Sequence, residues 1–168
     1  MEFDKVIRER KSTRRFSDKK VEKDTLLKIL EAGRLAPTAK NIQPIKIYVV
    51  ESEEGLKSID KASPCRYNAP VVLVVCGDKN KAFTKGEHST YEVDASIVAT
   101  HMLLEATNVG VDNIWVDMFD RDILRKEFSI PEDLIPVCIL PMGYKSKICP
   151  PSPLHKIRKS LDKIVEYK

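Results

Sequence analysis

The densest group of cationic side chains lies in residues 8–16, which read RERKSTRRF. Five of these nine residues are Arg or Lys, and Ser12 and Thr13 place two hydroxyl groups among them. Guanidinium, ammonium and hydroxyl groups are good donors to phosphate oxygens, so this composition indicates an anion-binding segment. Residue types alone leave three partners open: a nucleic-acid backbone, a kinase that recognises Ser12, and the phosphate of a bound small molecule.

A second polar segment, APTAKNIQP at residues 36–44, is bracketed by Pro37 and Pro44. Small hydroxyl and amide side chains in such a turn can donate hydrogen bonds to an anion or to the edge of a ring. On this segment alone, an ordinary capped connection between a helix and a strand is the better explanation.

Several chemical motifs are absent from the sequence. The six glycines are isolated, so there is neither a GxGxxG fingerprint nor a P-loop, and GxSxG and HExxH are missing too. Asp117 and Asp120 are close in sequence, but acids at this spacing near a strand end are common, and we do not assign them as an acid–base pair. The four cysteines and three histidines are widely scattered without a CxxC, so no metal site is expected.

Composition limits the class of protein. A chain of 168 residues with 42% hydrophobic content is expected to form one globular domain over residues 1–168. Its 29 basic and 25 acidic side chains nearly balance, which disfavours general nucleic-acid binding. No apolar run approaches the ~18 residues of a membrane span, and no signal peptide is visible. We therefore expect a cytoplasmic protein with reduced, structural cysteines.

Hydrophobic periodicity predicts the elements that position the two polar segments. Near-helical spacing of apolar residues predicts helices over residues 23–35, 54–61, 92–108 and 122–128. Branched and apolar runs predict strands over residues 45–50, 69–76, 111–117 and 137–143. The long third helix is apolar around most of its circumference and is expected to be buried, with Gly110 capping its C-terminus. Because helices and strands alternate, the fold class is α/β or α+β, around a sheet of four or five strands.

Taken in order, three segments of the chain resemble the nitroreductase family of FMN-dependent oxidoreductases. The first is RKSTRRF, where two basic residues are followed by Ser12, Arg14 and Phe16 in the family pattern. The second is a helix that ends in APTAKNIQP before a strand. The third is a long helix ending at Gly110, followed by a short strand that carries Trp115. The resemblance extends over nearly the whole chain and identifies it as a short member of the family.

This resemblance implies a fold and an assembly. The expected fold is α+β with three layers, in which helices flank a central mixed sheet of four to five strands. The family is typically a homodimer with FMN at the interface, and its C-terminal arm is swapped onto the other subunit. Residues 160–167, SLDKIVEY, are the candidate arm.

The resemblance also assigns the cationic residues to FMN. Arg10 and Ser12 match positions that hold the phosphate, and Lys11 matches a position beside the ribityl chain. Arg14 matches a basic residue near the pyrimidine edge, where a cation favours the anionic reduced flavin. Lys156 and Arg158 match a Lys-x-Arg pair that closes over the phosphate, although without the resemblance a solvated basic tail would be the simpler interpretation.

Two further segments match positions beside the flavin ring. Pro37, Thr38, Ala39 and Asn41 match the turn that typically reaches the flavin from the partner subunit. The strand that lies by the isoalloxazine, where a backbone amide donates to N5, is matched by Trp115, Val116, Asp117 and Met118. The family often has Gly at the position of Met118, so this side chain is expected to narrow the pocket or to shift the amide.

The chain departs from larger family members in two places. Residues 50–69 are short and lack a counterpart of the Asn and Lys that often assist the flavin, and Arg66 is the candidate replacement. The helical excursion that usually shapes the substrate channel is reduced as well. Only residues 79–90 remain to form a lid.

The implied function is that of an FMN-dependent NAD(P)H oxidoreductase with ping-pong kinetics. A hydride would pass from NADH or NADPH to N5 of FMN, and then to a nitroaromatic, quinone or similar small acceptor. No catalytic side chain is expected, because the cofactor carries the chemistry. The alternatives are a non-catalytic flavin-binding or storage protein and other flavin reactions of the same fold, namely dehalogenation and flavin fragmentation. No nucleic-acid, membrane or metal partner is expected.

Overall fold

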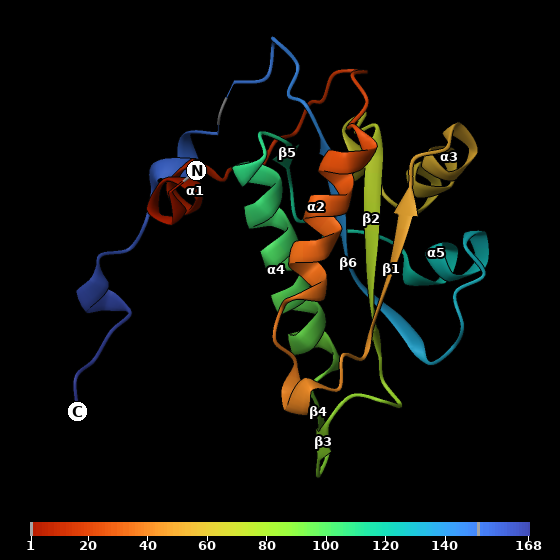
Figure 1. Ribbon diagram of the computed structural model, residues 1–168, viewed down its shortest axis with the longest axis vertical. Helices are drawn as coiled ribbons and strands as arrows, with labels where there is room; N and C mark the ends of the chain where they lie inside the picture. The colour runs from red at the N-terminus through yellow and green to blue at the C-terminus, as the bar shows by residue number, and fades with distance from the viewer. Residues whose placement is uncertain (1, 151) are drawn as a thin grey trace.

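The computed structural model describes residues 2–150 and 152–168. Its centre is one four-stranded sheet, formed by β1 (Ile45–Val50), β2 (Val71–Asp78), β5 (Asp112–Asn113) and β6 (Leu134–Gly143) in the order β1-β2-β6-β5. One face is covered by the helices α2 (Lys23–Arg34) and α4 (Tyr91–Asn108), and the other by α3 (Glu53–Ala62) and α5 (Arg121–Glu127) (Figure 1). The predicted three-layer α+β fold is therefore confirmed.

The sheet is antiparallel in all its paired strands. The parallel component expected of a mixed sheet is reduced to an isolated bridge between Ser12 and Asn113, outside the named strands. The strand predicted over residues 111–117 is also shorter than expected, because it pairs with β6 only at β5 and again at a bridge between Val116 and Ile139. Residues 10–16, called the basic segment below, therefore run along the outer edge of this short strand.

Strand β2 joins the two halves of the core. All eight of its residues are buried, as predicted for a central strand covered on both faces. Side chains at 71, 73 and 75 pack beneath α2 and α4, while those at 72, 74 and 76 pack beneath α3 and α5. Since full burial of a Val or Leu side chain stabilises by about 1.5–3 kcal/mol, this strand is a main source of hydrophobic stabilisation.

Helix α4 ends in the motif that its sequence predicts. Gly110 has a φ of +78°, a conformation that glycine adopts without steric cost. Its N–H donates to the Thr107 carbonyl at 3.1 Å, and the Val111 N–H donates to the Ala106 carbonyl at 2.7 Å. This pair of bonds is a Schellman motif, which satisfies two of the last carbonyls of the helix. It also directs the chain into β5.

The remaining elements lie at the periphery. Helix α1 (Phe3–Glu9) and the C-terminal segment, residues 152–168, lie together to one side of α4 (Figure 1). A short hairpin of β3 (Thr84–Lys85) and β4 (His88–Ser89) precedes α4. Residues 152–168 contain two short 3-10 helices, at Pro153–Lys156 and Leu161–Lys163. In the part of the chain that the structure describes, no helix is long and apolar enough to cross a membrane.

Candidate functional site

The basic segment that follows α1 is held in an extended conformation by Thr13. This residue is 3% exposed; its N–H donates to the Asn113 carbonyl at 3.0 Å, and its hydroxyl donates to Asp112 Oδ1 at 3.2 Å. Because successive side chains of an extended chain point in opposite directions, an inward Thr13 leaves Ser12 and Arg14 on the outward side. Sequence reasoning missed Thr13, whose partners lie about a hundred residues further along the chain.

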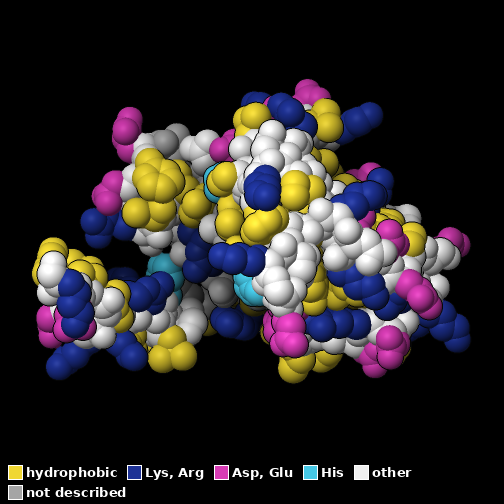
Figure 2. Space-filling view, turned by 90° about the horizontal axis from the view of Figure 1, so that it is seen from below, with side chains coloured by type: hydrophobic (Ala, Val, Ile, Leu, Met, Phe, Trp, Pro, Cys, Tyr) yellow, Lys and Arg dark blue, Asp and Glu magenta, His cyan; other side chains and the backbone are white. Residues whose placement is uncertain are grey.

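Four predicted residues of the basic segment share one pocket with the C-terminal segment. This pocket has a volume of about 190 Å³ and is lined by Arg10, Lys11, Ser12, Arg14, Ser152, Leu154, His155 and Arg158. Toward the left of Figure 2, Lys, Arg and His side chains gather around a hollow between the C-terminal segment and the rest of the molecule. The structure thus brings together residues that are more than a hundred positions apart in sequence.

The electrostatics of this pocket are those of an anion site. Burial lowers the pKa of Arg10 below its ordinary value, and the nearby Arg158 cation lowers it further. Arg10 forms no ion pair with an acid within residues 2–150 and 152–168. The Arg158 guanidinium donates to backbone carbonyls of its own segment, at 2.8 Å for His155 and 2.7 Å for Ile157. Two neighbouring cations without a counter-charge would be stabilised by a bound anion.

The other cations of the region are arranged differently. Lys156 lines an adjoining pocket, which shares Lys11 and His155 with the first one. Arg8 lines this adjoining pocket too, but its guanidinium pairs with Asp4 at 2.8 Å on the exposed surface of α1. Unlike Arg10, Arg8 therefore has an acidic partner.

The second polar segment forms a turn over residues 37–43 with an unusual backbone. Lys40, Asn41 and Gln43 have φ angles of 51°, 55° and 56°, in the left-handed region that non-glycine residues rarely adopt. The Thr38 hydroxyl accepts from the Gln43 N–H at 2.9 Å, and the Gln43 amide donates to Asn41 at 3.2 Å. These bonds close the turn on itself.

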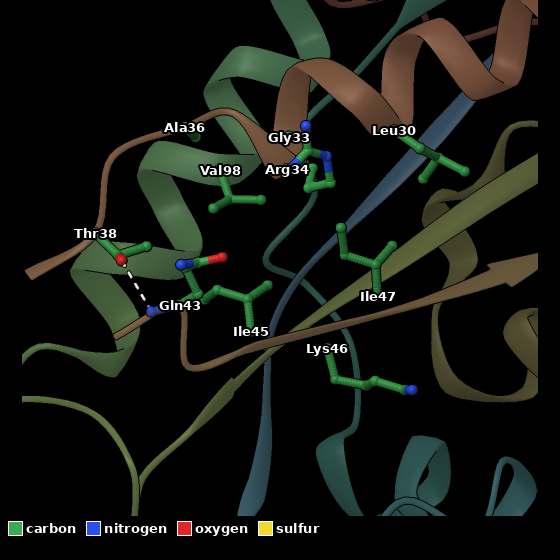
Figure 3. Close-up of a pocket in the computed structure, with 10 residues that line it drawn as sticks. All are labelled: Leu30, Gly33, Arg34, Ala36, Thr38, Gln43, Ile45, Lys46, Ile47 and Val98. Carbon is green, nitrogen blue, oxygen red and sulfur yellow. Dashed lines mark hydrogen bonds between the residues drawn. The ribbon is translucent and has the colours of Figure 1, made fainter. Parts of the chain in front are cut away.

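The inner side of the 37–43 turn borders an apolar pocket of about 230 Å³ between α2, α4 and β1. In Figure 3, Thr38 and Gln43 stand at one end of this pocket, joined by their hydrogen bond, and Ile45, Ile47 and Val98 line its wall. The same turn contains the other residues predicted there, Pro37, Ala39 and Asn41.

A buried carboxylate that sequence reasoning missed holds the 37–43 turn against α4. Asp94 is 1% exposed, and its Oδ1 accepts from the Ala39 N–H at 2.9 Å. Its Oδ2 accepts from the Thr90 hydroxyl at 2.8 Å. A lone Asp in the first turn of a helix is an ordinary feature of sequences, so nothing in the pattern distinguished this one.

The predicted strand residues 115–118 lie along β6, away from the basic segment. Trp115 packs against the core beneath α2 and α4, and Val116 exchanges two backbone hydrogen bonds of 3.0 Å with Ile139. Asp117 and Met118 are exposed, Met118 by 62%. The N–H groups of these two residues donate to no acceptor within the described residues, although the Met118 carbonyl accepts from the Ser63 hydroxyl at 2.6 Å. A backbone donor is therefore available at this position.

Arg66, the candidate replacement for missing contacts in residues 50–69, is committed elsewhere. Its guanidinium makes two 2.6 Å hydrogen bonds to Asp60 and a third to the Ala69 carbonyl, so it holds α3 to the following turn. Tyr67 lies closer to the basic segment, because its carbonyl accepts from the Phe16 N–H at 3.1 Å. A hydrogen bond with the Cys65 thiol and partial burial raise the pKa of Tyr67, while Arg14 acts in the opposite direction.

Within one chain, the predicted residues fall into separate groups. The basic segment meets the C-terminal pair near α1, whereas the 37–43 turn lies at the opposite end of α4, beside β3 and β4 (Figure 1). A single chain therefore does not assemble all of the predicted residues around one cavity.

Comparison with known proteins identifies the class. The model of the Nitroreductase family matches residues 7–65 and 61–144. A protein of Methanothermobacter thermautotrophicus, provisionally named an NADH dehydrogenase/NAD(P)H nitroreductase, is 31% identical over 154 residues, covering 88% of this chain and 79% of its own length. The chain belongs to the nitroreductase family, as the sequence motifs predicted.

Solved structures agree with this assignment. A nitroreductase family protein from Clostridium difficile 630 is 42% identical, with a TM-score of 0.93 over 100% of this chain and 99% of the other. A protein described as an FMN-dependent nitroreductase from Clostridium difficile R20291 is 26% identical, with a TM-score of 0.76 over 92% and 96% of the two chains. The fold of this chain is thus a nitroreductase fold.

Proposed function

We propose that this chain, acting as one domain over residues 1–168, is an FMN-dependent oxidoreductase that uses NAD(P)H. Family membership supports an oxidoreductase, and a relative of the same fold is described as FMN-dependent. The observation that carries the cofactor assignment is the pocket in which Arg10 and Arg158 face each other without an acid.

The residues of this pocket fit the phosphate of FMN. The pKa of Arg10 is lowered by burial and, to a smaller extent, by Arg158, and a phosphate dianion placed between the two cations would offset both effects. Ser12 would add a hydroxyl donor from the edge of β5, and Lys156 would approach from the adjoining pocket. Lys11 and Arg14, on the same segment, would then follow the ribityl chain toward the ring.

We infer that the ring is enclosed by two subunits. The 37–43 turn is distant from the basic segment of its own chain, so Pro37, Thr38, Ala39 and Asn41 would contact the flavin of a partner subunit. The apolar side chains of the C-terminal residues Leu161, Ile164 and Val165 are exposed in the isolated chain. In a homodimer they would pack on the other subunit as a swapped arm.

The strand residues Trp115, Val116, Asp117 and Met118 would lie by the isoalloxazine, with a free backbone N–H at Asp117 or Met118 as donor to N5. FMN, when bound, supplies hydride transfer between NAD(P)H and an acceptor such as a nitroaromatic or a quinone. The protein contributes charge near the phosphate and pyrimidine, and shape around the ring. Asp117 and Met118 are exposed, so an entering molecule would meet them directly.

Anaerobic titration of the FMN-loaded protein with NADH and with NADPH tests the proposal. We expect the flavin absorbance band to bleach with at least one nucleotide and to return when menadione or a nitroaromatic is added. A protein that binds no FMN would contradict the cofactor assignment. A protein that binds FMN but does not bleach would instead support a flavin-binding or storage role.

The assembly has its own test. Light scattering at micromolar concentration should give a mass about twice that of the 19.1 kDa chain. Deletion of residues 160–168 should shift this mass toward the monomer and weaken FMN binding. A full-length chain that remains monomeric while holding FMN would exclude the two-subunit site.

A further inference from the structure

Asp94 is an unusual residue to find in a helix–sheet core. Its carboxylate is almost fully buried at the first turn of α4, and no Lys or Arg within residues 2–150 and 152–168 pairs with it. A buried charge is costly unless hydrogen bonds compensate for the lost water. The compensation here comes from two groups outside the helix interior, the Ala39 N–H and the Thr90 hydroxyl.

The Ala39 N–H belongs to a turn that needs support. Left-handed backbone at a residue other than glycine costs about 1–2 kcal/mol, and Lys40, Asn41 and Gln43 all adopt it. Such a conformation persists only where the surroundings hold it in place. Asp94 supplies the hydrogen bond that joins the start of this turn to a rigid helix.

The same carboxylate also reaches the hairpin. Thr90 directly follows β4, and its hydroxyl donates to Asp94. Its N–H donates to the Phe83 carbonyl at 3.0 Å. The Lys40 ammonium lies 4.3 Å from the centre of the Phe83 ring, in a cation–π contact. The 37–43 turn and the 79–90 hairpin are therefore connected twice, once through Asp94 and once through Phe83.

We propose that Asp94 is a positioning residue that holds the 37–43 turn and the 79–90 hairpin as one unit against the flavin bound by the partner subunit. This inference rests on the proposed function. The turn would present Thr38 and Asn41 to the ring, and the hairpin would border the space that an acceptor enters. Through the Ala39 N–H, one buried carboxylate would then affect cofactor affinity and acceptor KM together.

A pair of substitutions on the two sides of one hydrogen bond tests the positioning role. Asp94→Ala removes the acceptor, and Ala39→Pro removes the donor without touching α4. Proline is tolerated at the first position of a helical turn, and the extended backbone of Thr38 (φ −133°, ψ 159°) suits a residue that precedes proline. We expect each change to weaken FMN binding about tenfold, and the double variant to be no weaker than either single one.

Two controls separate this role from general stability. Glu92→Gln removes an exposed carboxylate from the same helical turn and should leave FMN affinity and acceptor KM unchanged. Asp94→Asn keeps an acceptor for Ala39 and a partner for Thr90, so it should restore most of the affinity lost in Asp94→Ala. Additive effects of Asp94→Ala and Ala39→Pro, or unaltered affinity in both, would overturn the proposal.

A mixed dimer decides which flavin Asp94 serves. One subunit carries Arg10→Ala and the other Asp94→Ala, with different affinity tags for purification. If the turn serves the partner's flavin, both defects fall on one site and the other is intact, so the dimer binds one FMN tightly. If Asp94 acts on its own subunit's flavin, neither site is intact and the proposal is wrong. Tight binding by an Arg10→Ala homodimer would instead contradict the phosphate pocket of the proposed function, whatever Asp94 does.

Discussion

The basic segment and the 37–43 turn are both polar excursions beside a helix, yet they are built on different principles. The basic segment has an extended backbone, and its Arg10 lies near Arg158 with no ion pair to an acid among the residues that the structure describes. The turn has a strained backbone and only one cation, Lys40, which lies over the Phe83 ring. A phosphate is recognised by charge, whereas a flat ring needs donors at exact positions. The contrast therefore indicates which part of FMN each region would contact.

The two regions are also anchored to different elements. Thr13 fixes the basic segment to β5 at the edge of the sheet, and Asp94 fixes the turn to the start of α4. These anchors share no residue, so each region can be perturbed while the other is left intact. The predictions below use this independence.

The largest effect is expected at the basic segment. Arg10→Ala removes a charge-assisted hydrogen bond, which is worth about 1.5–3 kcal/mol, so FMN affinity should fall roughly 10- to 100-fold. Arg8→Ala, two residues earlier, breaks only an exposed pair with Asp4 and should leave the affinity within about twofold. Titration of both apo-proteins with FMN, followed by flavin fluorescence, measures the difference. Equal losses would remove the distinction between the two arginines.

Each region can be displaced separately by adding a Cβ to a neighbouring glycine, Gly77 for the 37–43 turn and Gly143 for the basic segment. A Cβ on Gly77 would lie 2.6 Å from the Tyr91 carbonyl oxygen at the start of α4, near Asp94. A Cβ on Gly143 would lie 2.6 Å from Pro70 Cδ and 3.3 Å from Phe16, beside the basic segment. Gly77→Ala and Gly143→Ala should each lower the free energy of unfolding by about 1–3 kcal/mol, measured by urea denaturation.

Their effects on ligand binding should differ. Gly77→Ala is expected to increase acceptor KM more strongly, because it moves the turn and the hairpin. Gly143→Ala is expected to weaken FMN binding, because a displaced Phe16 would also move Arg14, two residues earlier. The opposite pattern would show that the two anchors are not independent.

A smaller contrast concerns Arg66 and Tyr67. Arg66→Ala breaks a half-exposed ion pair with Asp60 and should cost about 1–2 kcal/mol of stability, between the values for exposed and buried pairs, with little effect on FMN. Tyr67→Phe removes a hydroxyl beside Cys65 and Arg14, and should change FMN affinity more than stability. Thermal unfolding and FMN titration of both variants would test this, and an Arg66→Ala protein that folds stably but loses FMN would reverse the assignment.

The smallest effect is expected at the hairpin. Lys40→Met removes a cation–π contact worth about 0.5–1 kcal/mol, while keeping a long apolar side chain over Phe83. Hydrogen exchange should become faster in residues 79–90 and remain unchanged in α2. Unaltered exchange in the hairpin would mean that Asp94 alone joins it to the turn.

Local sequence patterns predicted the elements well where their physical cause is local. The strand at residues 45–50 and the long helix, placed within a residue of its observed start, follow directly from side-chain alternation and helical spacing. Gly110 was found because a helix end that needs a left-handed residue strongly favours glycine. The pocket residues of the basic segment followed from family motifs rather than from periodicity.

The features that sequence reasoning missed depend on contacts between distant residues. Thr13 acquires its role from an edge strand 99 residues away, and Asp94 acquires its role from a turn 55 residues earlier. Neither partner can be inferred from neighbours in the chain. Arg66 shows the converse: its charge is visible in the sequence, but the acid that neutralises it, Asp60, is identified only by the fold.

The bridge between Ser12 and Asn113 has a consequence for solubility. Strand β5 is only two residues long, and the basic segment occupies its outer edge, where an unpaired strand would otherwise be open to other chains. The residues that would bind a phosphate therefore also cover the strand edge and should reduce edge-to-edge aggregation. If FMN binds there as proposed, its phosphate would hold these residues in place, so the protein should aggregate more readily in concentrated solution when the cofactor is removed.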